Sequence, residues 1–362
     1  MSRRLNRNGW CHLFLFEYLT SGLWPTDEPL PDSLAREGRA MLEAVARDFL
    51  ALDTSSLDLT WDARLELPQL GCKWHSPAPD SPGVDLFRST CGRLQVFQVA
   101  SNEAAVECFN HLSESRPNRM VIAPEFDSLL SSQLVVPERN PALVCLNVTL
   151  QAVELCADKY LLSELLQRYG VACVPGWLDP ADVPATHDRV VVKPRWGAGS
   201  QEIITIKREH AHQLQDGKRL FQPVVEGIPL SVAAIFDDTF ELKQVWPPAR
   251  QHLSDDGAYS YLGGSMPFTG VTQSQVDALV TSVAKHVPGL RGYVGFDFIL
   301  TPEGELVLVE INPRLTTSYV GYRALSNTSL APWLIPHKVP TDLPPFSGDV
   351  EFSPSGDIQM RS

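Results

Sequence analysis

The sequence predicts a mixed fold of class α/β and α+β, with an N-terminal α/β domain followed by a region of short strands. Strand-like and helix-like segments alternate over about the first 145 residues, and this order builds a parallel sheet with crossover helices. Beyond them, short apolar strands dominate. The last pair flanks a turn, residues 301–305, that contains Pro302 and Gly304. We therefore expect a hairpin over residues 293–312.

In the N-terminal domain, the apolar run 12–16 predicts a buried first strand. Apolar residues at helical spacing predict a helix over 33–50. A Pro/Gly/Ser-rich stretch, 68–84, is expected to be a loop. The other elements expected here are strands at 57–65, 94–100 and 120–123 and a helix at 102–112.

The second half of the chain opens with one long amphipathic helix, expected over 148–169 and closed by Gly170. The Pro-rich stretch after residue 331 is expected to lie over the surface as a tail. We divide the chain into an N-terminal domain (1–147), two further subdomains (148–226 and 227–330) and this tail (331–362). The other elements expected are strands at 173–177, 189–194, 201–206, 220–225, 231–236 and 241–246 and a helix at 272–287.

Composition and charge limit the classes of partner. The 362 residues are 44% hydrophobic and 20% charged, as in ordinary globular proteins, and the formal net charge is −13. Nucleic acids and anionic membranes require a basic surface, so neither is expected as the main partner. Small anionic substrates need only a few local cations and remain compatible. The sequence leaves open whether the chain forms a homo-oligomer.

The seven cysteines show neither a CxxC motif nor a zinc-ligand spacing, which is typical of reduced thiols in a cytoplasmic protein. The basic opening with Arg3, Arg4 and Arg7 precedes an apolar run, as in a signal peptide. However, Glu17 interrupts that run and no small-residue cleavage site follows. No stretch approaches the length of a membrane span.

Oxygen ligands gather on the predicted hairpin. Glu310 and Asn312 are two apart in a strand and so project to the same face. If Leu300 pairs near Leu306 or Val307, Asp297 lies almost opposite Glu310, within about 5 Å. Two carboxylates and an amide oxygen on one face suit Mg²⁺. The alternative is an exposed acidic face on an edge hairpin, but the apolar residues that alternate with these side chains favour a metal site.

A candidate phosphate site follows the predicted strand 189–194. Lys193 stands at the end of this apolar strand, and a loop of small residues with Gly197, Gly199 and Ser200 comes directly after it. Glycine-rich backbone can turn its N–H groups toward an anion, while the lysine adds a positive charge. Such a run is by itself more often a plain turn. Together with the metal hairpin, the phosphate interpretation is favoured.

Two further features of the sequence do not indicate a function when each is considered by itself. Lys159 lies within the predicted long helix, where a lysine is usually solvated. Residues 221–227 are a strand that runs into Gly227 and could offer backbone groups to a nucleobase.

In this order and spacing, Lys159, Lys193 with its glycine loop, the 222–227 hinge and the metal residues resemble the ATP-grasp superfamily over about residues 150–325. The resemblance implies a Rossmann-like N-terminal domain in front of a two-subdomain ATP-grasp fold. It implies that Lys159 and Lys193 contact ATP phosphates. Two Mg²⁺ ions, with Mn²⁺ as an expected substitute, would be held by Asp297, Asn312 and a bridging Glu310. Arg314 would steady an acyl phosphate or a substrate carboxylate, and the adenine would be lined by Gln222, Val224, Val225 and Glu226.

The chain departs from the superfamily pattern at one position. Members usually place an acid two residues past the hinge glycine to hold the ribose hydroxyls, and Pro229 stands there. Glu226 is the candidate to take that role.

Within the superfamily, short motifs around Glu17, Glu37 and Glu125 resemble the tyramine–glutamate ligase group of methanofuran biosynthesis, a branch of one-carbon coenzyme metabolism. This implies an ADP-forming carboxylate–amine ligase that acts through an acyl phosphate. One alternative is a bicarbonate-activating enzyme like the biotin carboxylases, although no Met-Lys-Met biotin-attachment motif is present. The other is a non-catalytic nucleotide-binding regulatory protein, which Pro229 favours and the intact metal residues disfavour.

Overall fold

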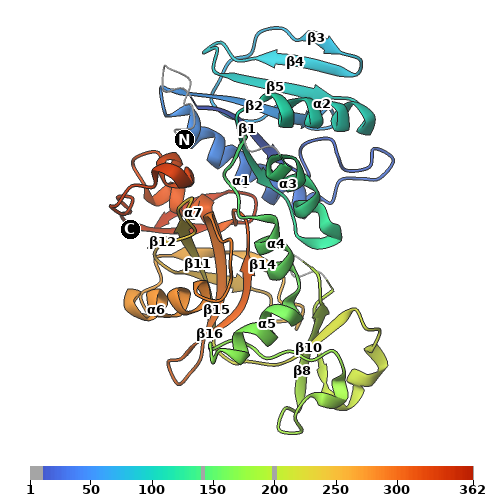
Figure 1. Ribbon diagram of the computed structural model, residues 1–362, viewed down its shortest axis with the longest axis vertical. Helices are drawn as coiled ribbons and strands as arrows, with labels where there is room; N and C mark the ends of the chain where they lie inside the picture. The colour runs from blue at the N-terminus through green and yellow to red at the C-terminus, as the bar shows by residue number, and fades with distance from the viewer. Residues whose placement is uncertain (1–10, 140–142, 198–201, 362) are drawn as a thin grey trace.

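The structure, a computed structural model, describes residues 11–139, 143–197 and 202–361. Its strands form three sheets of seven, three and eight strands (Figure 1). Gly199, Ser200 and the basic opening at Arg3, Arg4 and Arg7 lie outside the described residues.

The N-terminal sheet has the order β3-β4-β5-β2-β1-β6-β7. The pairs β5–β2, β2–β1, β1–β6 and β6–β7 are parallel, as the alternation of strands and helices predicted. Its elements are β1 (Cys11–Glu17), α1 (Asp32–Leu50), β2 (Ser55–Asp62), β5 (Leu94–Val99), α2 (Asn102–Ser115), β6 (Asn118–Ile122), α3 (Leu129–Arg139) and β7 (Val144–Cys145).

The edge of this sheet corrects one prediction. The stretch 68–84 was expected to be a loop, yet β3 (Ala78–Ser81) lies within it and pairs antiparallel with β4 (Val84–Arg88). All four residues of β3 are exposed, so hydrophobic periodicity could not reveal the strand.

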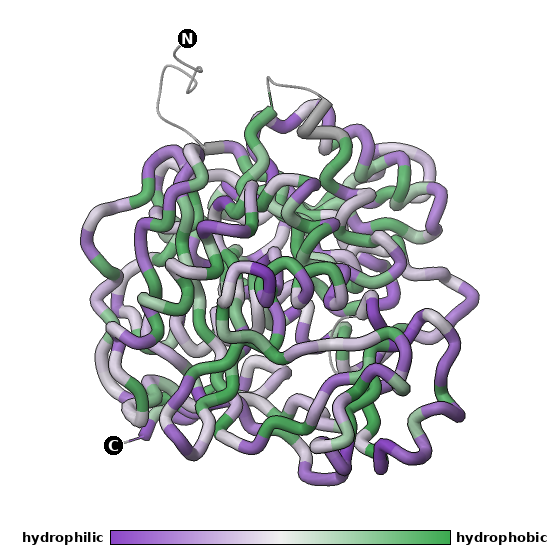
Figure 2. Tube along the Cα trace, turned by 60° about the horizontal axis from the view of Figure 1, so that its bottom comes forward, coloured by the Kyte–Doolittle hydropathy of each residue, from purple (hydrophilic) through white to green (hydrophobic). Residues whose placement is uncertain are grey.

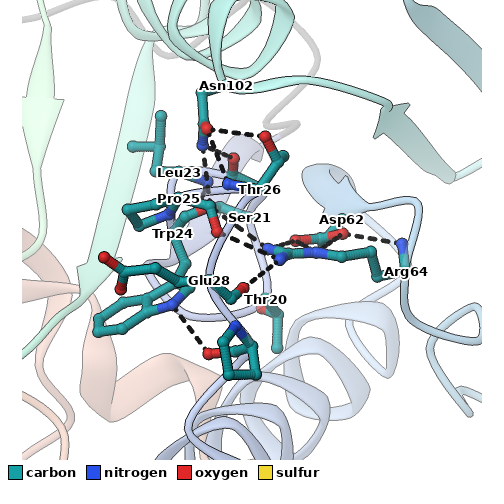
Figure 3. Close-up of polar contacts among 12 residues, drawn as sticks. Thr20, Ser21, Leu23, Trp24, Pro25, Thr26, Glu28, Asp62, Arg64 and Asn102 are labelled. Atoms are coloured by element: carbon teal, nitrogen blue, oxygen red, sulfur yellow. Dashed lines mark hydrogen bonds and ion pairs between the residues drawn. The ribbon is translucent and has the colours of Figure 1, made fainter.

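A polar network fixes the loop that joins β1 to α1 (Figure 3). The Arg64 side chain donates to both carboxylate oxygens of Asp62 and to the backbone carbonyls of Trp24, Pro25 and Glu28. The amide of Asn102 donates to the carbonyls of Gly22 and Trp24. Because these bonds satisfy the loop's carbonyls, the chain enters α1 along a defined path.

The predicted long helix is two helices, α4 (Leu150–Ala157) and α5 (Lys159–Arg168), so that prediction was wrong. The break is at Asp158, whose ψ of 89° is not helical. Its carboxylate accepts from the backbone N–H of Leu161, 3.1 Å away, and so caps α5.

The three-stranded sheet is antiparallel, in the order β10-β8-β9. It consists of β8 (Arg189–Pro194), β9 (Ile204–Lys207) and β10 (Arg219–Pro223) over a small core that includes Val190, Val192 and Phe221. The strand expected at 173–177 is reduced to isolated bridges at Cys173 and Trp177.

The eight-stranded sheet runs β16-β15-β11-β13-β14-β17-β18, with β12 also paired to β11. The expected surface tail is wrong in part, because β17 pairs with β14 and extends this sheet. The elements here are β11 (Ile228–Phe236), β12 (Leu242–Val245), β13 (Ala249–Leu253), β14 (Tyr261–Met266), α6 (Gln273–Ala284), β15 (Gly292–Leu300), β16 (Leu306–Asn312), α7 (Ser318–Leu325), β17 (Asp349–Phe352) and β18 (Ile358–Arg361).

Apolar segments run through the interior of the molecule (Figure 2). In α6 the buried side chains are Val276, Val280 and Val283, at the helical spacing that the sequence predicted. No helix in the described part of the chain has both the length and the apolar character of a membrane span. Short 3₁₀ helices occupy Phe126–Ser128, Pro180–Asp182, Arg208–Leu214, Ala331–Leu334 and Pro336–Lys338.

Candidate functional site

A cavity of about 920 Å³ is lined by residues from all three sheet regions. Most of the side chains singled out from the sequence contribute to its wall, although they are far apart along the chain. The predicted residues that line it are Lys159, Lys193, Gly197, Gln222, Val225, Asp297, Glu310, Asn312 and Arg314.

The hairpin holds the candidate metal residues in the expected register. Leu300 pairs with Leu306, and Asp297 pairs with Glu310. The register shifts by one residue between Asp297 and Phe298, and this bulge brings Asp297 directly opposite Glu310. The Asn312 amide nitrogen donates to Asp297 Oδ2 at 2.8 Å.

The two carboxylates differ in their electrostatic environment. Burial and the nearby charge of Glu310 raise the pKa of Asp297 to about 7. Burial also opposes the ionisation of Glu310, but the ammonium groups of Lys159 and Lys193 hold the pKa of Glu310 below its ordinary value. In the bare protein, Asp297 therefore takes up a proton more readily than Glu310.

Gln251 is a site residue that the sequence did not reveal. It lies on β13, and its amide nitrogen donates to Asp297 Oδ1 at 3.0 Å. Ser231 of β11 is the register partner of Asp297 on the other side. These neutral polar groups orient the buried carboxylate of Asp297 and satisfy its hydrogen-bonding capacity.

The oxygen atoms of Asp297, Glu310 and Asn312 fit a hard divalent cation such as Mg²⁺. Within residues 11–139, 143–197 and 202–361, no group of three or more His, Cys, Asp or Glu side chains could hold a metal ion. A site with two carboxylates and one amide suits Mg²⁺ bound together with water and substrate phosphate, because Mg²⁺ rarely takes its whole shell from protein.

Lys159 and Lys193 bring two cations to the same carboxylate. Lys159 Nζ lies 3.4 Å from Glu310 Oε2 and donates to the backbone oxygen of Gly197 at 2.5 Å. Lys193 is buried, with 5% of its surface exposed, although it lines the cavity. Burial lowers its pKa to about 8, against the opposing effect of Glu310. Two partly desolvated ammonium groups are well placed to attract a phosphate chain.

The alternation of β8 explains why Lys193 faces the cavity. Val190 and Val192 are fully buried in the small core, and Val191 and Lys193 line the cavity from the other face. The sequence did not show this alternation, because Val190, Val191 and Val192 are all apolar.

The pair Asp158–Arg195 was missed by the sequence analysis. Arg195 Nε and Nη2 lie 2.8 and 2.6 Å from the two carboxylate oxygens of Asp158. The backbone N–H of Lys159 donates to the carbonyl of Arg195 at 3.2 Å. This pair therefore ties the start of α5, and Lys159 with it, to the end of β8. The two residues are 37 positions apart, and no local pattern links them.

Only some of the predicted hinge residues line the cavity. Gln222 is buried and donates to the carbonyl of Val174 at 3.2 Å. Val225 lines the cavity, whereas Val224 and Glu226 are not among its lining residues and Glu226 is exposed. Pro229 lines the cavity instead.

Arg314 faces the N-terminal domain. Its Nε lies 3.0 Å from Glu125 Oε1, and Nη2 donates to Glu125 Oε2 at 3.2 Å. Burial disfavours the charged form, but Glu125 and Glu37 together raise the pKa of Arg314. Glu37 on α1 accepts a hydrogen bond from Thr317 Oγ1 and also lines the cavity. The glutamates of the three sequence motifs, Glu17, Glu37 and Glu125, thus lie around the Arg314 end of the cavity. Glu17 lines a small adjoining space of about 50 Å³.

Residues 156–318 match the family model of the ATP-grasp domain. The chain is 28% identical over 218 residues to a tyramine–L-glutamate ligase from Methanocaldococcus fervens, an alignment that covers 60% of this chain and 64% of that protein. A tyramine–L-glutamate ligase from Methanocaldococcus jannaschii is 27% identical over 227 residues, 62% of this chain and 63% of that protein. The chain thus aligns with less than two thirds of the length of these curated relatives.

Solved structures give a similar result at the level of the fold. A structure titled as an ATP-grasp superfamily protein, from Archaeoglobus fulgidus, is similar with a TM-score of 0.64 and 20% sequence identity. The similarity covers 95% of this chain and 92% of that chain.

Proposed function

The chain carries an ATP-grasp domain, as its sequence predicted, and on that premise we propose that it is an ADP-forming carboxylate–amine ligase. The observation that carries this proposal is the convergence of Asp297 and Glu310 with Lys159 and Lys193 in one cavity. An oxygen-rich metal face beside two ammonium groups is what the transfer of a γ-phosphoryl group requires.

In the proposed reaction, a carboxylate oxygen of the first substrate attacks the γ-phosphorus of ATP. The bond from this phosphorus to the bridging oxygen breaks, and ADP leaves with the electron pair. The nitrogen of a primary amine then attacks the acyl carbon, and phosphate departs as the amide forms. Of the two protons that the ammonium group loses overall, one stays with the departing phosphate and the other passes to solvent.

Each residue has a proposed part in this sequence. Lys159 and Lys193 bind phosphate oxygens, and Arg314 steadies the acyl phosphate or the substrate carboxylate. Of the four residues predicted to line the adenine, Gln222 and Val225 line the cavity, and we assign them to the adenine contact. Gly199 and Ser200 keep their proposed place in the phosphate loop on sequence grounds alone.

We propose that Asp297, Glu310 and Asn312 hold two Mg²⁺ ions with Glu310 as the shared ligand, and that Mn²⁺ can replace them. Such ions supply charge neutralisation on the phosphates. We assign no residue to the ribose, because Pro229 occupies the usual position of the ribose-binding acid and Glu226 is exposed.

The proposed substrate pair is glutamate and tyramine. It is supported by the two Methanocaldococcus relatives, which are tyramine–L-glutamate ligases. On this basis we place the protein in methanofuran biosynthesis and in the cytoplasm. The location is supported by the free thiols of Cys72, Cys108, Cys156 and Cys173, which persist in reducing compartments.

The test is a coupled assay of ADP release with Mg²⁺, ATP, glutamate and tyramine, together with mass detection of γ-glutamyltyramine. Formation of both products supports the proposal. If AMP and pyrophosphate appeared instead, attack would occur at the α-phosphorus and the mechanism would be wrong. ADP formed only with another acid or amine would remove the substrate pair and leave the ligase.

A further inference from the structure

One end of the cavity lies outside the nucleotide and metal sites proposed above. Beyond Arg314, its wall is formed by Leu34 and Glu37 of α1, Thr317 at the start of α7, and Tyr261 of β14. This end joins the metal face through the short segment that runs from Asn312 to Thr317.

Glu37 is a carboxylate on this wall that makes no direct ion pair within the described part of the chain. Its carboxylate accepts a hydrogen bond from the neutral hydroxyl of Thr317. Among the residues that the structure describes, no Lys, Arg or His forms an ion pair with Glu37. The charge of Arg314 partly offsets the rise in the pKa of Glu37, but the two-point contact of Arg314 is with Glu125. Burial raises the pKa of Glu37, so its ionised form is incompletely compensated in the bare protein.

A carboxylate buried in a cleft without a direct ion pair favours the binding of a cation, because the cation would supply the positive charge that its ionised form lacks. The apolar side chain of Leu34 and the ring of Tyr261 lie on the same wall. A ligand that fits both features has an ammonium head and an apolar body.

We propose that Glu37 binds the ammonium head of the acceptor amine and so sets the preference of the enzyme for cationic primary amines. The proposal rests on the proposed ligase function and identifies a residue that positions its second substrate. Since Thr317 holds Glu37 beside Arg314, the amine would lie next to the carboxylate that becomes activated. The acyl phosphate forms before the amine attacks it. Glu37 therefore governs binding of the amine and not the formation of the acyl phosphate.

The experiment compares two nucleophiles in wild-type protein and Glu37→Gln. Tyramine is cationic near neutral pH, whereas hydroxylamine is mostly uncharged and traps an acyl phosphate as a hydroxamate. In Glu37→Gln we expect the KM for tyramine to rise by about tenfold or more, since a hydrogen bond between two charged groups is lost. Hydroxamate formation and the KM values for ATP and glutamate should stay at wild-type levels.

Two further variants complete the test. Glu37→Asp keeps the charge and should recover much of the affinity for tyramine. Glu103→Gln is the same chemical change at an exposed position of α2 and should behave as wild type.

Each contrary outcome overturns a different statement. An unchanged KM for tyramine in Glu37→Gln would remove the role of Glu37. A rise confined to the KM for glutamate would assign Glu37 to the α-ammonium of the donor, and an equal loss with hydroxylamine would make the residue structural. Absence of hydroxamate in the wild-type protein would instead remove the proposed ligase function.

Discussion

Asp158 and Arg195 form a two-point ion pair, with N–O distances of 2.8 and 2.6 Å, that joins the break between α4 and α5 to the end of β8. The pair lies next to Lys159, whose ammonium group is 3.4 Å from Glu310. The position of Lys159 therefore depends on a contact outside the cavity.

Asp158→Ala removes both this ion pair and the cap of α5. We expect the protein to lose roughly 1–2 kcal/mol of stability from the cap alone. We also expect its KM for ATP to rise by about tenfold, because Lys159 loses its anchor. Thermal denaturation and steady-state kinetics measure the two effects.

The matched control is Ser101→Ala, which removes the N-cap of α2. It should lower stability to a similar extent while leaving the KM for ATP unchanged. If both variants left the KM unchanged, Asp158 would have only a structural role.

Glu310→Gln tests the metal face. It removes the charge proposed to bridge the ions, so Mg²⁺-dependent ATP turnover should fall by about a hundredfold or more. Circular dichroism should show an intact fold, because the variant loses the attraction of Glu310 to Lys159 and also its repulsion with Asp297. Glu305→Gln makes the same change in the exposed turn of the same hairpin and should retain full turnover. Normal turnover in Glu310→Gln would refute the metal site.

Lys193→Ala tests the phosphate site. Titration calorimetry should show weaker binding of ATP, with a loss of about tenfold or more, since a buried charge on phosphate is removed. Lys207→Ala, at an exposed position of β9, should bind ATP as the wild type does. If the wild type and both variants bound ATP with equal affinity, Lys193 would have no role in phosphate binding.

Glu17 gives the bare protein a specific pH dependence. Burial raises the pKa of Glu17 to about 7 from an ordinary value of 4.5, so the folded state binds a proton more tightly than the unfolded chain. The contribution of Glu17 to stability is therefore complete below the unfolded pKa and is lost as pH rises through about 7. Within this window the loss is roughly 1.4 kcal/mol per pH unit for this one group.

The measurement is thermal denaturation of wild-type protein and Glu17→Gln from about pH 5 to about pH 8, without nucleotide or metal. The wild type should lose stability relative to the variant as pH rises, because other titrating groups act equally on both. A constant difference across this range would contradict the prediction.

The sequence predicted the parts of the fold that depend on local patterns. The approximate pairing of Asp297 with Glu310 was predicted because a short turn fixes the register of a hairpin, but the bulge that brings them directly opposite was not. The sequence placed Lys193 at the end of an apolar strand, and the structure shows that Lys193 lines the cavity. The break at Asp158 could not be predicted, since the residues on both sides favour a continuous helix and the partner is Arg195. The pairing of β17 with β14 likewise depends on a distant strand. The four-part domain division remains a prediction.

The wall of the cavity is formed by separate parts of the polypeptide. Lys193, Asp297 and Glu310 come from β8, β15 and β16, whereas Glu37 comes from α1, ahead of all of them in the chain. A substitution on α1 can therefore alter one end without disturbing the strands that form the other. With the proposed role of Glu37, a change in the first helix would alter which acceptor amine binds and would leave the phosphate and metal residues in place.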